Sequence, residues 1–233
     1  MKTMGMKAYE GEALVLTCMD LRQMDEVAEY LGTTQYAAPR EHNGTKPSAG
    51  AGLKDLYDHV AMAGAALGAV SPLKPHWNQA FWDHVDLAVA LHKVKRLIII
   101  EHQDCGAYKA LFMPAFRRGC IGAANATKDG WADEEEEAAC HYRMARALRN
   151  EVLRRTHKLD VEILYAALPF GSTHATIRLF NEREIERALR EEAEDEKEAE
   201  IRKLVAAADQ ADKARSVNGL PPPPSDNEKR ATA

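Results

Sequence analysis

Residues 96–101, with the sequence Arg-Leu-Ile-Ile-Ile-Glu, constrain the fold of this chain more than any other segment. The apolar run is continuous and β-branched, which is typical of a strand that is buried on both faces. A second short apolar run, residues 13–17, has the same character. Strands of this kind belong to parallel sheets that are covered by helices on both sides. The two runs therefore predict an α/β fold.

The rest of the chain alternates helical and extended patterns. Apolar residues at helical spacing, or an acidic start followed by arginines, predict helices over 23–31, 78–93, Gly106 to Leu111 and 134–157. Gly32 is expected to cap the first of these helices. Apolar runs predict further strands over 59–62 and 161–168, and Asn181 with Glu184 three residues later resembles another helix start. This alternation predicts a mainly parallel β-sheet flanked by helices.

Composition divides the chain into three parts. We expect one domain over 1–180, a charged C-terminal helix over 181–217 and a Pro-rich disordered tail over 218–233. Because its surface is densely charged, the C-terminal helix is expected to be solvated and to dock on a partner subunit. Residues 33–52, rich in Gly, Pro, Asn and Thr, predict a long loop, as do residues 119–130.

Charge and composition exclude several classes of protein. The 31 basic and 36 acidic residues are interspersed, so the basic footprint of a nucleic-acid binder is missing. No apolar run has the character of a signal peptide or the length of a membrane span. We therefore expect a cytoplasmic protein without nucleic-acid or membrane partners. Four cysteines in 233 residues do not indicate a disulfide scaffold, and spaced Cys and His residues are then more often metal ligands or catalytic groups.

Two chemically suggestive clusters follow the two strongest strands. The first strand is followed by Cys18-Met19-Asp20-Leu21-Arg22, and the second by His102-Gln103-Asp104-Cys105. Because ligands of such sheets sit outside the carboxyl ends of the strands, we expect the two clusters to meet at one edge. Two thiolates and one imidazole suit zinc, and three protein ligands leave a fourth tetrahedral position for water or substrate. The sequence therefore predicts a catalytic zinc ion on Cys18, His102 and Cys105.

The two clusters resemble the signature of the β-class carbonic anhydrases, which pairs Cys-x-Asp-x-Arg with a later His-x-x-Cys-Gly. Residues 18–22 and 102–106 match both halves, and the resemblance extends from residue 14 to residue 168. It implies a β-carbonic-anhydrase-like zinc domain and a homodimer or higher homo-oligomer. The chain departs from the family at Ala61-Met62-Ala63-Gly64-Ala65, where the family commonly has Arg-Asn-Ala-Gly-Gly, and the 33–52 loop looks inserted.

The resemblance implies a zinc lyase that hydrates carbon dioxide reversibly to bicarbonate by attack of zinc-bound hydroxide. Two thiolates neutralise the formal charge of Zn²⁺, so the bound water needs help from neighbouring residues. Ionised Asp20 is expected to accept a hydrogen bond from the hydroxide, while Arg22 holds Asp20 through a bidentate pair. In part of the family the equivalent aspartate swings onto the zinc, and Asp20 has the same option.

Two other functions stay open at this stage. The same zinc site would suit a carbonyl sulfide or carbon disulfide hydrolase. Because of the departure at residues 61–65, a non-catalytic zinc-binding assembly protein that acts through its C-terminal helix and tail is a further alternative.

Other Cys, His and Asp residues are expected to lie outside the predicted metal site. Cys120 and Cys140 lack ligand partners at a convincing spacing and are expected to be ordinary thiols. His84 and His92 are expected to pack or face solvent, although a proton-shuttle role is conceivable. Asp104 lies between two predicted ligands. Its position fits a residue that supports those ligands and fits an exposed side chain equally well, so we leave it outside the predicted site.

Overall fold

The computed structural model describes residues 10–33, 52–72, 74–109, 131, 133–155, 159–168, 172 and 174–217. Several sequence predictions lie wholly or mostly outside these residues: the long loop at 33–52, Leu111, the loop at 119–130, Cys120 and the C-terminal tail.

A five-stranded sheet forms the centre of the domain, in the order β2-β1-β3-β4-β5. The strands are β1 (Ala13–Thr17), β2 (Tyr57–Ala61), β3 (Arg96–His102), β4 (Asp160–Ala167) and β5 (Thr176–Arg178). The first four are parallel to their neighbours, and β5 is antiparallel to β4. The predicted mainly parallel α/β fold is confirmed. The sequence did not predict β5, because three residues are too few to show a strand period.

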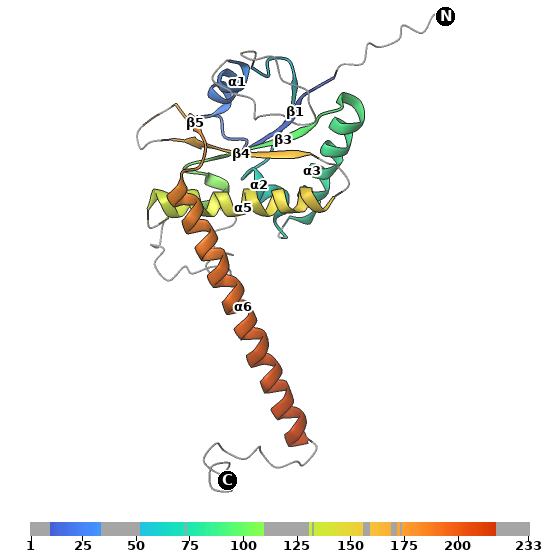
Figure 1. The fold of residues 1–233 in the computed structure, drawn as a ribbon, viewed down its shortest axis with the longest axis vertical. Coiled ribbons are helices and arrows are strands. Elements are labelled where there is room, and N and C mark those ends of the chain that lie inside the picture. The colour runs from blue at the N-terminus through green and yellow to red at the C-terminus, as the bar shows by residue number, and fades with distance from the viewer. Residues whose placement is uncertain are drawn as a thin grey trace, which may run out of the picture.

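Helices cover both faces of the sheet (Figure 1). Helix α1 (Met24–Gly32) lies on one face, and the other carries α2 (Ala66–Val70), α3 (Pro75–Leu87), the π-helical η1 (Ala88–His92) and α5 (Glu134–Arg154). Because side chains alternate along a strand, β1 and β3 contribute to both resulting cores. Leu16 and Ile99 pack with the α3 and α5 side, whereas Val15 and Ile98 pack with α1. This double burial explains the continuous apolar runs.

Two local predictions differ from the structure. Gly32 is the last residue of α1 and no left-handed cap follows it, since Thr33 is extended. The backbone N–H of Leu53 instead donates to the Leu31 carbonyl, at 2.5 Å, so a distant segment satisfies the helix end. The helix predicted at 78–93 begins three residues earlier, with Pro75 at a position where its missing N–H is harmless, and becomes π-helical at Ala88.

Helix α6 (Glu182–Val217) begins as the sequence predicted. The Asn181 N–H donates to the Glu184 carboxylate and the Glu184 N–H donates to the Asn181 side chain, which forms a reciprocal cap. The first part of α6 packs against α5, and the helix then extends away from the sheet (Figure 1). Among the helices within the described ranges, none is both long and apolar enough to cross a bilayer.

Candidate metal centre

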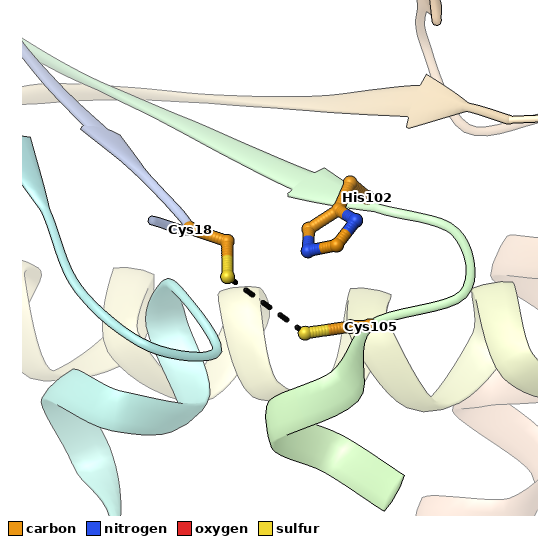
Figure 2. A group of neighbouring side chains, drawn as sticks. All are labelled: Cys18, His102 and Cys105. Atoms are coloured by element: carbon orange, nitrogen blue, oxygen red, sulfur yellow. Dashed lines mark hydrogen bonds between the residues drawn. The ribbon is translucent and has the colours of Figure 1, made fainter. Parts of the chain in front are cut away.

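The three predicted ligands meet at the carboxyl edge of the sheet. Cys18 directly follows β1, His102 ends β3, and Cys105 lies three residues further on. Because β1 and β3 pair in parallel, with Thr17 opposite Ile100, their ends lie side by side. The ligand atoms of the three residues are within 4.8 Å of one another, and all three residues are buried. Figure 2 shows the two sulfur atoms, which are 3.9 Å apart, with the imidazole facing them.

The imidazole of His102 is oriented for a metal ion. Its Nδ1 lies 2.9 Å from the backbone carbonyl of Gln103 and donates to it, which leaves Nε2 as the nitrogen that can coordinate a metal ion. Nε2 is buried and makes no hydrogen bond within the described part of the chain. An unpaired buried polar atom is unfavourable, and a metal ion would supply the missing partner. The three residues therefore fit a transition-metal ion with nitrogen and sulfur ligands.

The sulfur of Cys18 lies in surroundings that favour the thiolate. A hydrogen bond from Cys105 lowers the pKa of Cys18 to about 4, against the opposing effect of burial. The same contact, together with burial, raises the pKa of Cys105. Burial lowers the pKa of His102, but the neighbouring Cys18 raises it more, so this pKa lies above its usual value. A metal ion would displace the proton that the two sulfurs share.

The loop between β2 and α2 also contacts Cys18, although it departs from the family pattern. The backbone N–H of Gly64 donates to the Cys18 sulfur at 3.3 Å. Gly64 has a φ of 78° and Ala65 a φ of 44°, so both adopt left-handed backbone. Glycine accepts this region readily, but it strains Ala65. The segment at residues 61–65 thus donates a hydrogen bond to the Cys18 sulfur and contains a strained alanine.

Asp20 and Arg22 form the bidentate pair that the sequence predicted. Nε of Arg22 donates to Oδ1 of Asp20 at 2.9 Å, and Nη2 donates to Oδ2 at 2.7 Å. The Arg22 backbone N–H also donates to Oδ1. These hydrogen bonds lower the pKa of Asp20 to about 2. Asp20 therefore stays ionised beside the ligand group, with both oxygens engaged by Arg22.

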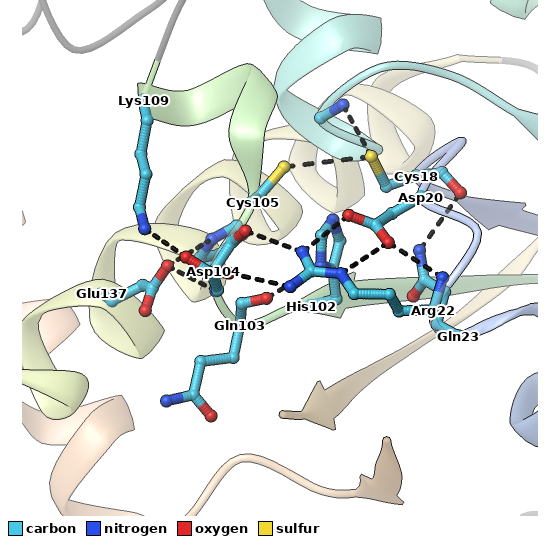
Figure 3. A network of polar contacts seen from close by, with 12 residues as sticks. Cys18, Asp20, Arg22, Gln23, His102, Gln103, Asp104, Cys105, Lys109 and Glu137 are labelled. Carbon is cyan, nitrogen blue, oxygen red and sulfur yellow. Dashed lines mark hydrogen bonds and ion pairs between the residues drawn. The ribbon is translucent and has the colours of Figure 1, made fainter. Parts of the chain in front are cut away.

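Asp104, which the sequence left undecided, belongs to this network (Figure 3). Nη1 of Arg22 donates to Oδ2 of Asp104 at 2.8 Å, and Nη2 donates to its backbone carbonyl at 3.1 Å. The Asp104 N–H donates to Glu137 in the first turn of α5, and Lys109 pairs with the Asp104 carboxylate. No sequence pattern indicated these contacts, since Arg22 and Asp104 are 82 residues apart.

Behind His102 lies a buried carboxylate that sequence reasoning also missed. Glu101 accepts hydrogen bonds from the Ala66 N–H, the Tyr108 hydroxyl and Nδ1 of His141, at 2.8, 3.2 and 2.7 Å. Burial raises the pKa of Glu101 to about 8 and lowers that of His141 to about 3. Glu101 thereby ties α2 and α5 to the strand that ends at His102. An ionisable residue directly after the apolar run at residues 97–100 was the available signal.

The remaining candidates lie apart from the ligand group. Cys140 is a buried free thiol whose pKa is raised by burial, as expected for an ordinary core cysteine. His84 bonds to the Ala80 carbonyl at 2.7 Å, and His92 pairs with Asp58 at 2.8 Å. Both histidines line a pocket of about 240 Å³ that none of the three ligands lines. Their hydrogen bonds thus favour packing and surface roles.

No protein-family model matches the chain. Two uncharacterized proteins match over 102 residues, or 44% of this chain. The one from Rickettsia bellii is 29% identical over 52% of its own length, and the one from Rickettsia conorii is 26% identical over 46%. The chain thus spans about half the length of the curated relatives it matches.

Two solved structures of carbonic anhydrases resemble the chain weakly. The enzyme from Streptococcus mutans has a TM-score of 0.37 and 17% identity, over 75% of this chain and 86% of its own. The enzyme from Glaciozyma antarctica has a TM-score of 0.34 and 15% identity, over 74% and 85%. At these scores, neither match assigns an activity to this chain.

Proposed function

We propose that this chain binds one zinc ion through Cys18, His102 and Cys105 and catalyses the reversible hydration of carbon dioxide to bicarbonate. The observation that carries the proposal is Nε2 of His102, which is buried and unpaired among the described residues and faces two thiols 3.9 Å apart. A zinc ion in such a site lowers the pKa of a bound water to near neutrality and so supplies a nucleophile. The chain would then be a carbonic-anhydrase-like lyase.

The side chains around the ligands suit this reaction. Asp20 is kept ionised by Arg22, so it accepts a hydrogen bond from the reacting water and orients the attacking lone pair. The Gly64 N–H withdraws charge from the Cys18 sulfur, which partly offsets the neutralisation of the metal by two thiolates. The Nδ1–H of His102 is held by the Gln103 carbonyl, which fixes the ring for coordination.

Stopped-flow carbon dioxide hydration by zinc-loaded protein tests the proposal. Asp20→Ala should lower kcat/KM by roughly 100-fold, in the range expected for loss of a group that handles a proton in the transition state. Asp25→Ala removes an exposed acid from the first turn of α1 and serves as the matched control, with unchanged rates. Zinc-replete wild-type protein without hydration from about pH 7 to 9 would contradict the proposal. Turnover of carbonyl sulfide by that inactive protein would favour the hydrolase alternative.

We also propose a homodimer or larger homo-oligomer. Met19 and Leu21 flank Asp20 with 69% and 86% of their surface exposed, and a second copy would cover this apolar surface. Light scattering should give at least twice the chain mass, and a monomer at all concentrations would disprove this assembly.

The division into a zinc domain over 1–180, a charged helix over 181–217 and a Pro-rich tail over 218–233 is likewise proposed. Its support is the start of α6 at Glu182, directly after the reciprocal cap at Asn181. A chain truncated after residue 180 should retain zinc, and loss of zinc would reject this boundary.

A cytoplasmic location is also proposed. Cys18 and Cys105 must stay reduced to bind zinc, and Cys140 is a free thiol, which suits a reducing compartment. Recovery of the protein outside the cytoplasmic fraction would refute it.

A further inference from the structure

Two loops that are distant in the chain carry the proposed metal ligands. One follows β1 and runs from Cys18 to Arg22, and the other follows β3 and runs from His102 to Cys105. Arg22 joins them. Its guanidinium donates to both oxygens of Asp20 on its own loop, and to Oδ2 and the backbone carbonyl of Asp104 on the other. The planar fork of the guanidinium is therefore divided between the two loops, which a lysine ammonium could not reproduce.

Asp104 is fixed independently of Arg22. Its φ of 59° is left-handed, a conformation that Asp tolerates better than most residues do. Its backbone N–H donates to Glu137 at 2.8 Å, and Glu137 is buried in the first turn of α5. Lys109 pairs with its other carboxylate oxygen. The backbone of Asp104 is therefore held by α5, independently of its contacts with Arg22.

We propose that Asp104 is a positioning residue of the metal centre. By holding Arg22 it sets the spacing between the two ligand-bearing loops and keeps Asp20 turned toward the ligand group. The charges alternate along the chain of contacts from Asp20 through Arg22 and Asp104 to Lys109, so each side chain is held by an opposite charge. Ligands that are spaced in advance lose less freedom when the metal binds. This inference rests on the proposed function in taking the ligand group to be a zinc site.

Zinc affinity of the full-length protein, measured by competition with a chromophoric chelator, tests the inference. Asp104→Asn keeps the shape of the side chain, and Asp104→Gly removes it while accepting the left-handed backbone. Both should weaken zinc binding by roughly 10- to 100-fold, the usual range when a partner behind the metal ligands is lost. Asp25→Asn is the matched control, because it makes the same change at an exposed acid in the first turn of α1, outside this network. It should bind zinc like the wild type.

Combining Asp104→Asn with Arg22→Ala tests whether Asp104 affects zinc binding through Arg22. If Asp104 acts through Arg22, adding Asp104→Asn to Arg22→Ala should cause no further loss of affinity. Cobalt(II) absorption spectra should change in Asp104→Asn and stay unchanged in Asp25→Asn, since the spectrum reports ligand geometry rather than global stability. Wild-type affinity in both Asp104 variants would overturn the inference while leaving the proposed zinc site intact. An equal loss in the Arg22→Ala background would overturn it too. A wild-type chain that binds no zinc would instead reject the proposed function.

Discussion

Arginine–carboxylate pairs occur both at the candidate metal centre and at the contact between α5 and α6, but they are built differently. At the metal centre, Asp20 and Asp104 lie on loops and share one guanidinium. The Asp20 carboxylate also accepts from the Arg22 backbone N–H, and the Asp104 backbone N–H donates to Glu137. At the helix contact, Arg143 pairs with Asp195, and Arg146 pairs with Glu192.

The difference shows how one kind of interaction serves two purposes. The side chains of Arg146 and Glu192 are each about one-third exposed, as is Arg22, so exposure does not separate the two regions. The acceptors do. Arg146 pairs with a carboxylate on the neighbouring helix and so attaches α6 to α5, whereas Arg22 donates to two carboxylates and a backbone carbonyl on two loops. The position of the Arg22 guanidinium is therefore set by several acceptors at once.

The largest expected effect comes from removing a proposed ligand. Cys105→Ser should reduce bound zinc from about one ion per chain to nearly none, because it removes a thiolate from the metal. Elemental analysis measures this directly. Cys140→Ala is the matched control, since Cys140 is also a buried free thiol but lies outside the ligand group, and it should keep its zinc. Full zinc retention in Cys105→Ser would contradict the ligand assignment.

Replacing arginine by lysine should lower activity at the metal centre but not at the contact between α5 and α6. Arg22→Lys should lower carbon dioxide hydration by roughly 10- to 100-fold, because an ammonium cannot hold two carboxylates with a planar fork. Arg146→Lys should leave the rate unchanged and alter the free energy of unfolding by less than about 1 kcal/mol, as for exposed ion pairs. Rates and urea denaturation of both variants provide the comparison. Equal effects would mean that the fork at the metal centre has no orienting role.

The smallest expected effect concerns the strained loop beside Cys18. Ala65→Gly should raise the free energy of unfolding by about 1 kcal/mol, because relief of left-handed strain exceeds the added entropy of the unfolded chain. The midpoint of urea unfolding measures it. Ala61→Gly at the end of β2, where the backbone is extended, should have the opposite sign. If both variants were destabilised by a similar amount, the positive φ of Ala65 would not cost the folded state measurable free energy.

Much of the fold followed from local patterns. The runs at 13–17 and 96–101 are buried on both faces, and a β-branched run of that length has few alternatives. The proximity of Cys18 to His102 and Cys105 followed from the rule that parallel strands end at one edge. Strand β5 and the end of α1 were not predictable in the same way. The first is too short to show a period. The second depends on a hydrogen bond from Leu53, a residue that is distant from α1 in the chain.

The sequence by itself determined the α/β sheet, the grouping of the three metal-ligand candidates and the Asp20–Arg22 pair. These depend on residues that are neighbours in the chain or on the regular geometry of parallel strands. Only the tertiary structure decided that Asp104 holds Arg22, that Glu137 holds Asp104, and that Glu101 ties two helices to the ligand strand. Those contacts join residues 33 to 82 positions apart, and their formation depends on how loops and helices pack, which no local pattern encodes.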